Sequence, residues 1–358
     1  MKAGIITITN GENYGNRLQN YAVQEALKDI GLIPETIHKT TNVFNSEDIS
    51  FIWKLRIKYI LHYHITKEEK RILNFYRFTH KYIKKSRFII DKNVPAELEQ
   101  EYQYFIAGSD QVWNPYFDYC TKENFLTFTE HDKKIAFSPS IAVTRIPKER
   151  EADFRNWISD FRLLSVRESQ GAEIIYQLCG RKAEVLCDPT IYLSAQKWRK
   201  LEKKVKSIKK PYILTYFLGE CPKELRKRID QMAQNKKREV FCLQTPEHYS
   251  IAPDEFLYLV DHADCVFTDS YHGTIFSLIF HTPFWVFTRK ENFVDMSSRI
   301  DDLLSAFHMK DRLWNSSTDL GIFQIDFTES DRIITQLQKK IYGFLKKIYE
   351  GENNAKSD

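Results

Sequence analysis

The sequence predicts an α/β protein with two Rossmann-like domains, each built on a parallel sheet, and an additional C-terminal helix. Short apolar runs alternate with amphipathic helical segments along almost the whole chain, which is typical of parallel βαβ units. Several of these runs are apolar without interruption, as expected of strands that are buried on both faces. The alternation stops and restarts near residues 191–210, so the 358 residues are expected to form two domains.

The first domain is expected to cover residues 1–190. It opens with the apolar run AGIITIT, a buried strand, and continues with RLQNYAVQEALKDIG, a helix that stops at Gly31. Further strands are predicted at IPETIHK, YQYFIAGSD, KKIAFSPS, FRLLSVRES and AEVLCDPT, with helices at KEREADFRNWIS and GAEIIYQLCG. Each strand ends in small or polar residues, which is where a ligand would be bound.

A basic and aromatic insertion, residues 51–90, interrupts this domain and is expected to be helical. The simpler interpretation is a pair of helices packed on the first domain, with lysines that are merely solvated. Alternatively, the segment lies on an anionic bilayer or guides a lipid-linked substrate. The sequence leaves both interpretations open.

The second domain is expected to cover residues 191–328. Strands are predicted at PYILTYFLG, REVFCLQ, DCVFTDS and PFWVFT, and helices at PKELRKRIDQMAQNK, PDEFLYLVDHA and GTIFSLIF. Residues 329–358 are expected to form a long amphipathic helix followed by a frayed tail.

The overall composition narrows the class of partner. The net charge of +5 suits anionic substrates or an acidic membrane surface, and it is too small to indicate nucleic acid. Six cysteines without C-x-x-C spacing argue against a zinc site and fit reduced thiols, so we expect no metal and a cytoplasmic protein. No apolar run is long enough to predict a membrane span, and the N-terminal residues do not resemble a secretory signal.

Polar residues cluster after two strands of the first domain. NGENYGNR follows the first strand and supplies Asn13, Asn16 and Arg17 next to a helix start that could receive an anion, although a plain turn with an asparagine cap would look similar. GSDQVWNP follows another strand, and its mixture of amide, carboxylate and indole groups suits sugar hydroxyls and a sugar face. The candidates there are Ser109, Asp110, Gln111, Trp113 and Asn114.

Arg167 ends the strand in LLSVRES, where a guanidinium is well placed to fork onto a phosphate or carboxylate. An ion pair with Glu168 is the simpler alternative. Asp188, in LCDPT, is expected to be a structural turn residue.

His272 lies between the strand DCVFTDS and the helix GTIFSLIF. The partial positive charge of a helix N-terminus lowers the pKa of an imidazole, and a bound anion raises it again. Such a histidine can be protonated when substrate binds, as a general acid must be. The alternative is a histidine that only caps the helix.

Several of these stretches, taken together, resemble the polysaccharide pyruvyl transferase family of bacterial surface-glycan gene clusters. They are NYGNRLQNYAVQEAL, FIAGSDQVWNP, SVRESQGAEII, CDPT and TDSYHGTIFSLIF, in this order. The resemblance implies two facing Rossmann-like domains of the GT-B type, with the acceptor on the first domain and the donor on the second. It further implies phosphoenolpyruvate as donor, no cofactor, and a sugar or lipid-linked oligosaccharide of a capsule or exopolysaccharide as acceptor, bridged by a pyruvate ketal.

The resemblance also suggests roles for individual residues. His272 matches the family's proposed acid. Arg167 matches an arginine thought to hold the anionic groups of the donor, and Ser270, Gly273 and Thr274 are also expected to bind the donor. Better-studied members have Arg-Leu-His where this chain has Ser-Tyr-His, so Ser270 replaces an arginine. Arg299 is our first candidate to replace that arginine, and Arg17 and Arg289 are the next candidates. Asp110 could take the hydroxyl proton.

Two other functions fit the same sequence. One is a glycosyltransferase that uses a nucleotide sugar on the same architecture. The other is a non-enzymatic, membrane-associated glycan-binding protein whose binding surface is the 51–90 segment.

Overall fold

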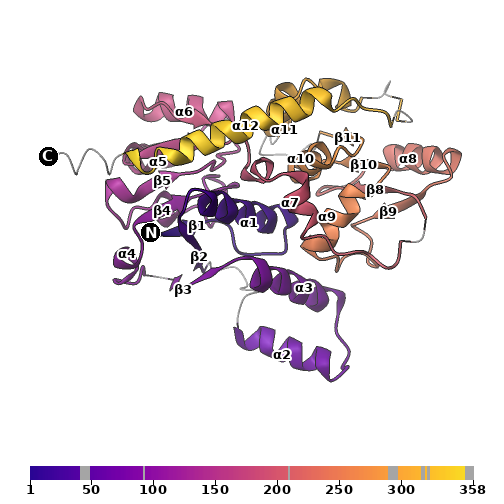
Figure 1. Cartoon of the computed structure of the whole chain (residues 1–358), viewed down its shortest axis with the longest axis horizontal. Coiled ribbons are helices and arrows are strands. Elements are labelled where there is room, and N and C mark those ends of the chain that lie inside the picture. Colours follow the sequence, from indigo (N-terminus) through magenta and orange to yellow (C-terminus); the bar gives the residue numbers. More distant parts are fainter. Residues whose placement is uncertain are drawn as a thin grey trace. The chain divides into compact units, whose positions relative to one another are not determined.

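The computed structural model describes residues 1–40, 49–91, 93–208, 210–288, 297–315, 319–320 and 323–350. The chain forms two compact units. Unit 1 comprises Met1–Phe51, Thr79–Leu193 and Thr335–Asp358, and unit 2 comprises Ile52–Phe78 and Ser194–Ile334. Each unit has a parallel sheet with helices packed on it (Figure 1), which confirms the predicted fold class of two Rossmann-like α/β domains.

Unit 1 is built on a seven-stranded sheet in which all neighbouring strands are parallel. The strands are β1 (Lys2–Ile6), β2 (Ile33–Lys39), β3 (Lys85–Ile90), β4 (Tyr104–Ala107), β5 (Lys134–Ala136), β6 (Leu163–Val166) and β7 (Glu184–Val185). Their order is β3-β2-β1-β4-β5-β6-β7, so the direction of winding reverses between β1 and β4. Ligands of such sheets bind at this reversal, beyond the carboxyl ends of the strands.

The helices of unit 1 are α1 (Tyr14–Asp29), α4 (Leu98–Glu101), α5 (Lys148–Ser159), α6 (Ser169–Cys179) and the later part of α12 (Thr328–Lys346). The α1 helix begins at the cap residue Asn13 and stops before Gly31, which has a φ of +87° that glycine adopts readily. The last described residues are anchored in this unit, because the Tyr349 hydroxyl donates to the carbonyl of Ile30 and Phe344 stacks on Phe137.

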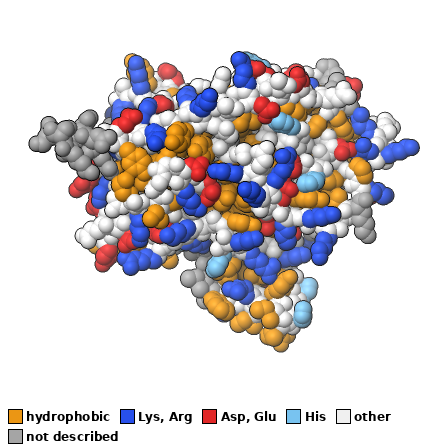
Figure 2. All heavy atoms as spheres, viewed as in Figure 1, with side chains coloured by type: hydrophobic (Ala, Val, Ile, Leu, Met, Phe, Trp, Pro, Cys, Tyr) orange, Lys and Arg blue, Asp and Glu red, His pale blue; other side chains and the backbone are white. Residues whose placement is uncertain are grey.

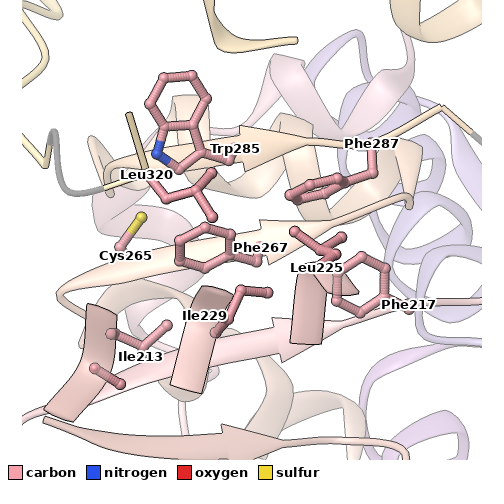
Figure 3. Packing of buried hydrophobic residues seen from close by; sticks show 10 residues of the cluster. Ile213, Phe217, Leu225, Ile229, Cys265, Phe267, Trp285, Phe287 and Leu320 are labelled. Carbon is pink, nitrogen blue, oxygen red and sulfur yellow. The ribbon is translucent and has the colours of Figure 1, made fainter. Parts of the chain in front are cut away.

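Unit 2 is built on a four-stranded parallel sheet in the order β11-β10-β8-β9. The strands are β8 (Tyr212–Tyr216), β9 (Glu239–Cys242), β10 (Cys265–Thr268) and β11 (Phe284–Val286). The helices are α7 (Ala195–Arg199), α8 (Lys223–Asn235), α9 (Pro253–Asp261), α10 (Tyr271–Phe280) and α11 (Ser297–Ala306). Here the winding reverses between β8 and β10. Figure 3 shows Ile213, Phe267 and Trp285 of the sheet packed with Leu225 and Ile229 of α8.

The basic insertion differs from the prediction in two ways. It contains the helices α2 (Ile49–Ile60) and α3 (Lys67–Tyr82), but its last residues form the edge strand β3, since Lys85 and Ile90 pair with Thr36 and Lys39 of β2. The expectation of a helix up to residue 90 was therefore wrong. Residues 52–78 belong to unit 2, whereas the whole insertion was expected in the first domain.

Two contacts from α3 account for this packing. The guanidinium of Arg71 donates to the Tyr249 carbonyl, and the Asn74 amide donates to the Ser250 carbonyl, both at 2.6 Å. Among the described helices, none has both the length and the apolar character that a membrane span requires.

Candidate functional site

In unit 1, the direction of winding reverses between β1 and β4, and we call this place the reversal point. Hydrogen bonds link the carboxyl ends of these two strands there. The Thr7 hydroxyl donates to the Ser109 carbonyl at 3.0 Å, and the Gln19 amide donates to Thr7 Oγ1 at 2.9 Å. Gln19 Oε1 also accepts from the Ser109 N–H at 3.2 Å. Gln19 was not among the predicted site residues, and it fixes the spacing of the two loops that carry most of them.

The first of these loops leads into α1. The Asn13 side chain caps the helix by accepting from the Asn16 N–H at 3.2 Å. Arg17 is buried and donates to the Gly11 carbonyl at 2.9 Å, so its guanidinium braces the loop. No acidic residue lies in the first turn of α1, which leaves the positive end of the helix dipole available to an anion.

A small cavity lies behind this loop. Its volume of about 10 Å³ is room for a single water molecule, so it is not a sugar site. His38 lines it and its Nδ1 lies 2.9 Å from Thr9 Oγ1, a pairing that the sequence did not suggest. The lining residues are Thr9, Arg17, Asn20, Thr36, His38, Thr79, Ile83 and Lys85.

The loop after β4 presents Asp110, which has a left-handed backbone with φ of 69°. Its Oδ1 accepts from the Gln111 N–H at 2.9 Å and from Arg167 Nη2 at 3.0 Å. Arg167 Nη1 donates to Asp188 at 2.5 Å, and the Arg167 side chain is only 1% exposed. These contacts show that Arg167 holds Asp110 in place, and its predicted contact with a donor phosphate stays a prediction.

The neighbouring residues complete this edge of the sheet. Asp188 also accepts from the N–H and the hydroxyl of Thr190, as expected of a turn residue. The Glu168 carboxylate accepts from Ser140 Oγ and from the N–H groups of Ile141 and Ala142. These contacts therefore argue against the alternative of a surface ion pair between Glu168 and Arg167.

Three residues of the GSDQVWNP motif are structural. The Trp113 ring is fully buried and stacks on Phe125 at 5.0 Å, and its Nε1 donates to the Asn124 carbonyl. The prediction that Trp113 offers its face to a sugar was therefore wrong. The Ser109 hydroxyl donates to the Ser138 carbonyl, and Asn114 bonds Gln111 Oε1 and the Tyr116 N–H. These contacts of Ser109 and Asn114 shape the turn after β4.

In unit 2, the reversal point lies at the carboxyl ends of β8 and β10. Residues 268–274, which we call the seam, connect β10 to α10 there. Asp269 was not among the predicted site residues. Its carboxylate accepts from the N–H groups of Leu218 and Gly219 at 2.6 and 2.9 Å and so links the end of β10 to the loop after β8. Ser270 caps α10 by accepting from the Gly273 N–H at 3.3 Å. The Thr274 hydroxyl donates to the Ser270 carbonyl at 3.0 Å.

Gly273 is required by close packing. A Cβ atom there would lie 2.6 Å from Thr268 Oγ1, which donates to the Tyr216 carbonyl and accepts from the Ser270 N–H. The helix start can therefore approach the strand end only without a side chain at this position.

His272 follows in the first turn of α10 and is 8% exposed. Its ring meets Tyr271 edge to face, with centroids 5.5 Å apart, and the Arg299 guanidinium lies 6.0 Å from the Tyr271 centroid. The Tyr271 ring thus lies between the His272 imidazole and the Arg299 guanidinium in this series of contacts. Arg289, the other arginine proposed for this domain, lies outside the described residues.

Two further features of unit 2 were not anticipated. A hollow of about 320 Å³ is lined on α3 by Lys70 and Arg77 and, after β9, by His248, and its walls also include Glu247 and Glu255. Within the described chain, Glu202, Asp261 and His262 have metal-ligand spacing, but Arg199 already forks onto Asp261. Burial, and then Asp261, raise the pKa of Glu202 to about 8.

A sequence model described as polysaccharide pyruvyl transferase matches residues 13–291, which include both reversal points. No curated protein sequence matches the chain. Among solved structures, a putative UDP-N-acetylglucosamine 2-epimerase from Listeria monocytogenes is similar with a TM-score of 0.51 and 8% identity, over 96% of this chain and 90% of that one.

UDP-GlcNAc 2-epimerase from Methanocaldococcus jannaschii gives a TM-score of 0.48 and 12% identity, over 95% of this chain and 100% of that one. At such identities, the Listeria likeness concerns the fold alone. The sequence match covers most of the chain, and it includes the seam at His272. The chain belongs to the polysaccharide pyruvyl transferase family.

Proposed function

We propose that this protein transfers pyruvate from phosphoenolpyruvate to two hydroxyls of one sugar, forming a pyruvate ketal on a surface glycan such as a capsule or exopolysaccharide. Membership of the family supports a pyruvyl donor and a sugar acceptor. The observation that carries the finer proposal is the position of His272, in the first turn of α10 at the reversal point of the unit 2 sheet. An ionisable ring there meets a site that favours anions.

The reaction needs an acid at the methylene carbon of the donor. Protonation of that carbon by His272 converts it to a methyl group and leaves an oxocarbenium-like centre at the carbon that bears the phosphate. One sugar hydroxyl adds to this centre, phosphate leaves, and the second hydroxyl closes the ketal. Of the two hydroxyl protons, one replaces the proton given to the methyl group and the other leaves with phosphate, so the sum is balanced.

The donor's negative charge requires a clamp. The N–H groups that begin α10 and the guanidinium of Arg299, one ring away from His272, can supply it. In this proposal Arg299 replaces the family arginine whose position Ser270 occupies, and Ser270, Gly273 and Thr274 shape the helix start. No metal or cofactor is needed for these steps.

The acceptor is assigned to the reversal point of unit 1. Asp110 is the candidate to receive a hydroxyl proton, and Arg167 keeps its carboxylate in place. Gln111 and the start of α1, with Asn13, Asn16 and Arg17, would orient the sugar. If the acceptor is a lipid-linked precursor, the protein works in the cytoplasm at the inner face of the membrane.

Ligand-induced thermal stabilisation tests the donor assignment. Because a ligand that binds only the folded protein raises its apparent stability, phosphoenolpyruvate should raise the unfolding temperature more than an equal concentration of inorganic phosphate. Nucleotide sugars should have no effect. Stabilisation by a nucleotide sugar and none by phosphoenolpyruvate would instead favour the glycosyltransferase alternative, and stabilisation by glycan alone would favour a binding protein.

A further inference from the structure

The α2 helix carries apolar side chains on two opposite faces. Ile52 and Leu55 are 1% exposed and pack into unit 2. Trp53, Ile57 and Ile60 are 57%, 50% and 67% exposed. Their spacing of four and three residues places these three on one face of the helix, and Figure 2 shows hydrophobic side chains gathered on the part of the surface where Figure 1 places α2.

The exposed face continues past the end of the helix with Leu61 and Tyr63, which are 58% and 64% exposed. We name these five residues, Trp53, Ile57, Ile60, Leu61 and Tyr63, the α2 stripe. Isolated exposed apolar residues are common on soluble proteins, but a contiguous group of this size marks a surface that binds something. The charges beside the stripe indicate what it binds.

Between Ile49 and Thr66 the sequence has three lysine or arginine residues, Lys54, Arg56 and Lys58, and no acidic residue. At about 100° per residue, Lys54 and Arg56 project on either side of the stripe, and both are exposed. The Arg56 guanidinium lies 5.2 Å from the Trp53 ring centroid. Lys58 is paired with Glu69 at 2.8 Å, so the charge that flanks the stripe comes from Lys54 and Arg56.

We propose that the α2 stripe docks on an anionic lipid bilayer, with the helix lying in the plane of the interface. A helix with an apolar strip, basic flanks and tryptophan and tyrosine at its border has the features of interfacial helices. The absence of acidic residues from this stretch of sequence favours a uniformly anionic surface. A second copy of the chain would bring the same basic flanks together, which like-charge repulsion disfavours.

This docking is an interaction additional to pyruvyl transfer. It fits the proposed function in that a lipid-linked acceptor would then be met at the membrane, but vesicle binding is measured with neither donor nor acceptor present. A failure of the docking proposal and a failure of the donor assignment are therefore told apart by separate experiments.

Flotation of the full-length protein with vesicles tests the docking. Wild type should float with phosphatidylcholine vesicles that contain phosphatidylglycerol and hardly at all with phosphatidylcholine alone. The combined change Trp53→Ser, Ile57→Ser and Ile60→Ser should weaken binding about a hundredfold or more, from the lost apolar burial. The matched control is Tyr176→Ser on α6, which is similarly exposed at 54% and should bind like wild type.

A second pair of variants keeps the test decisive if the triple variant does not fold. Lys54→Gln with Arg56→Gln preserves the apolar face and should weaken binding on the order of fivefold for each charge removed, with a reduced salt dependence. Trp53→Phe should retain binding but lose the part of the tryptophan fluorescence that doxyl-labelled lipids quench.

Three results would overturn the proposal. The first is a wild-type protein that does not bind anionic vesicles, and the second is a triple variant that folds and still binds as well as wild type. The third is a dimer in sedimentation velocity that the serine changes dissociate, which would make the α2 stripe an interface between copies of the chain.

Discussion

The guanidinium of Arg167 lies 3.0 Å from the carboxylate of Asp110, and both side chains are almost fully withdrawn from solvent. A second carboxylate, that of Asp188, holds the other terminal nitrogen of the guanidinium. This arrangement fixes the one carboxylate at the β4 end that we assign to proton transfer. In the proposed reaction, Arg167 would therefore act through Asp110.

The first prediction follows from this pairing. Arg167→Ala should lower the free energy of unfolding by about 3–5 kcal/mol, because two buried carboxylates lose their counter-charge. Urea unfolding measures this loss. Asp110→Asn, which keeps the shape, should destabilise the protein less and reduce turnover. A stable Arg167→Ala protein whose only defect is weak phosphoenolpyruvate binding would support the direct donor contact that the sequence suggested.

The second prediction concerns Arg299. Arg299→Ala should weaken phosphoenolpyruvate binding by about 1.5–3 kcal/mol, the range for a hydrogen bond to a charged group. Arg228→Ala is the matched control, since Arg228 also lies 6.0 Å from an aromatic centroid, that of Trp314, in unit 2. Isothermal titration would measure both. Equal affinities in the two variants would remove Arg299 from the donor site.

The third prediction concerns the glycine at the start of α10. Gly273→Ala should destabilise the protein by about 1–3 kcal/mol, because the new methyl group collides with Thr268 and disturbs its two hydrogen bonds. Gly343→Ala is the control: its Cβ would meet nothing within 4 Å, and alanine is favoured within a helix. Thermal unfolding should move in opposite directions for the two variants. A neutral Gly273→Ala would mean that this contact relaxes easily.

The fourth prediction concerns pH and Lys39. This buried ammonium donates to the Tyr119 carbonyl, to Thr121 Oγ1 and to Asn124, and burial lowers its pKa from 10.5 to about 8. Between these two values the unfolded chain binds more protons than the folded one, so stability should rise with pH in that window. Relative to Lys39→Met, wild type should gain about 1.5 kcal/mol between about pH 8 and about pH 9.5.

Urea unfolding of both proteins at each pH provides this measurement, and the difference between them cancels the other titrating groups. A difference that does not change with pH would show that the three acceptors keep Lys39 charged throughout. The pKa of the lysine would then be close to its ordinary value.

The sequence predicted the sheets well because buried parallel strands are continuous apolar runs that end in recognisable polar residues. It also placed Asp110 and His272 at strand ends, which is a consequence of local pattern alone. The strand β3 was not predicted because its residues, SRFII, directly follow a basic helix without a clear turn signal. Its pairing with β2 is also non-local.

The differences at the site have a common cause. Residue type at a strand end does not reveal which way a side chain points, and Trp113 turns into the core while Arg167 turns to two aspartates. Gln19 and Asp269 were missed because their partners lie in other segments of the chain, and only the folded structure shows those hydrogen bonds.

The role of His272 as the acid can be tested apart from binding. His272→Gln retains a hydrogen bond but has no transferable proton, so turnover should fall by about 10²–10⁴-fold, which is typical for loss of a general acid. Its affinity for phosphoenolpyruvate should change much less. Near wild-type turnover would mean that the ring only caps the helix or clamps the donor.

The central claim is that pyruvate passes from phosphoenolpyruvate to sugar hydroxyls, and the mass spectrum of the glycan product tests it most directly. The reaction is run in deuterium oxide with phosphoenolpyruvate and surface-glycan acceptors. We expect the acceptor to gain the mass of one pyruvate less one water, with one deuterium in the new methyl group. An acceptor unchanged by phosphoenolpyruvate, but extended by a whole sugar from a nucleotide sugar, would contradict pyruvyl transfer.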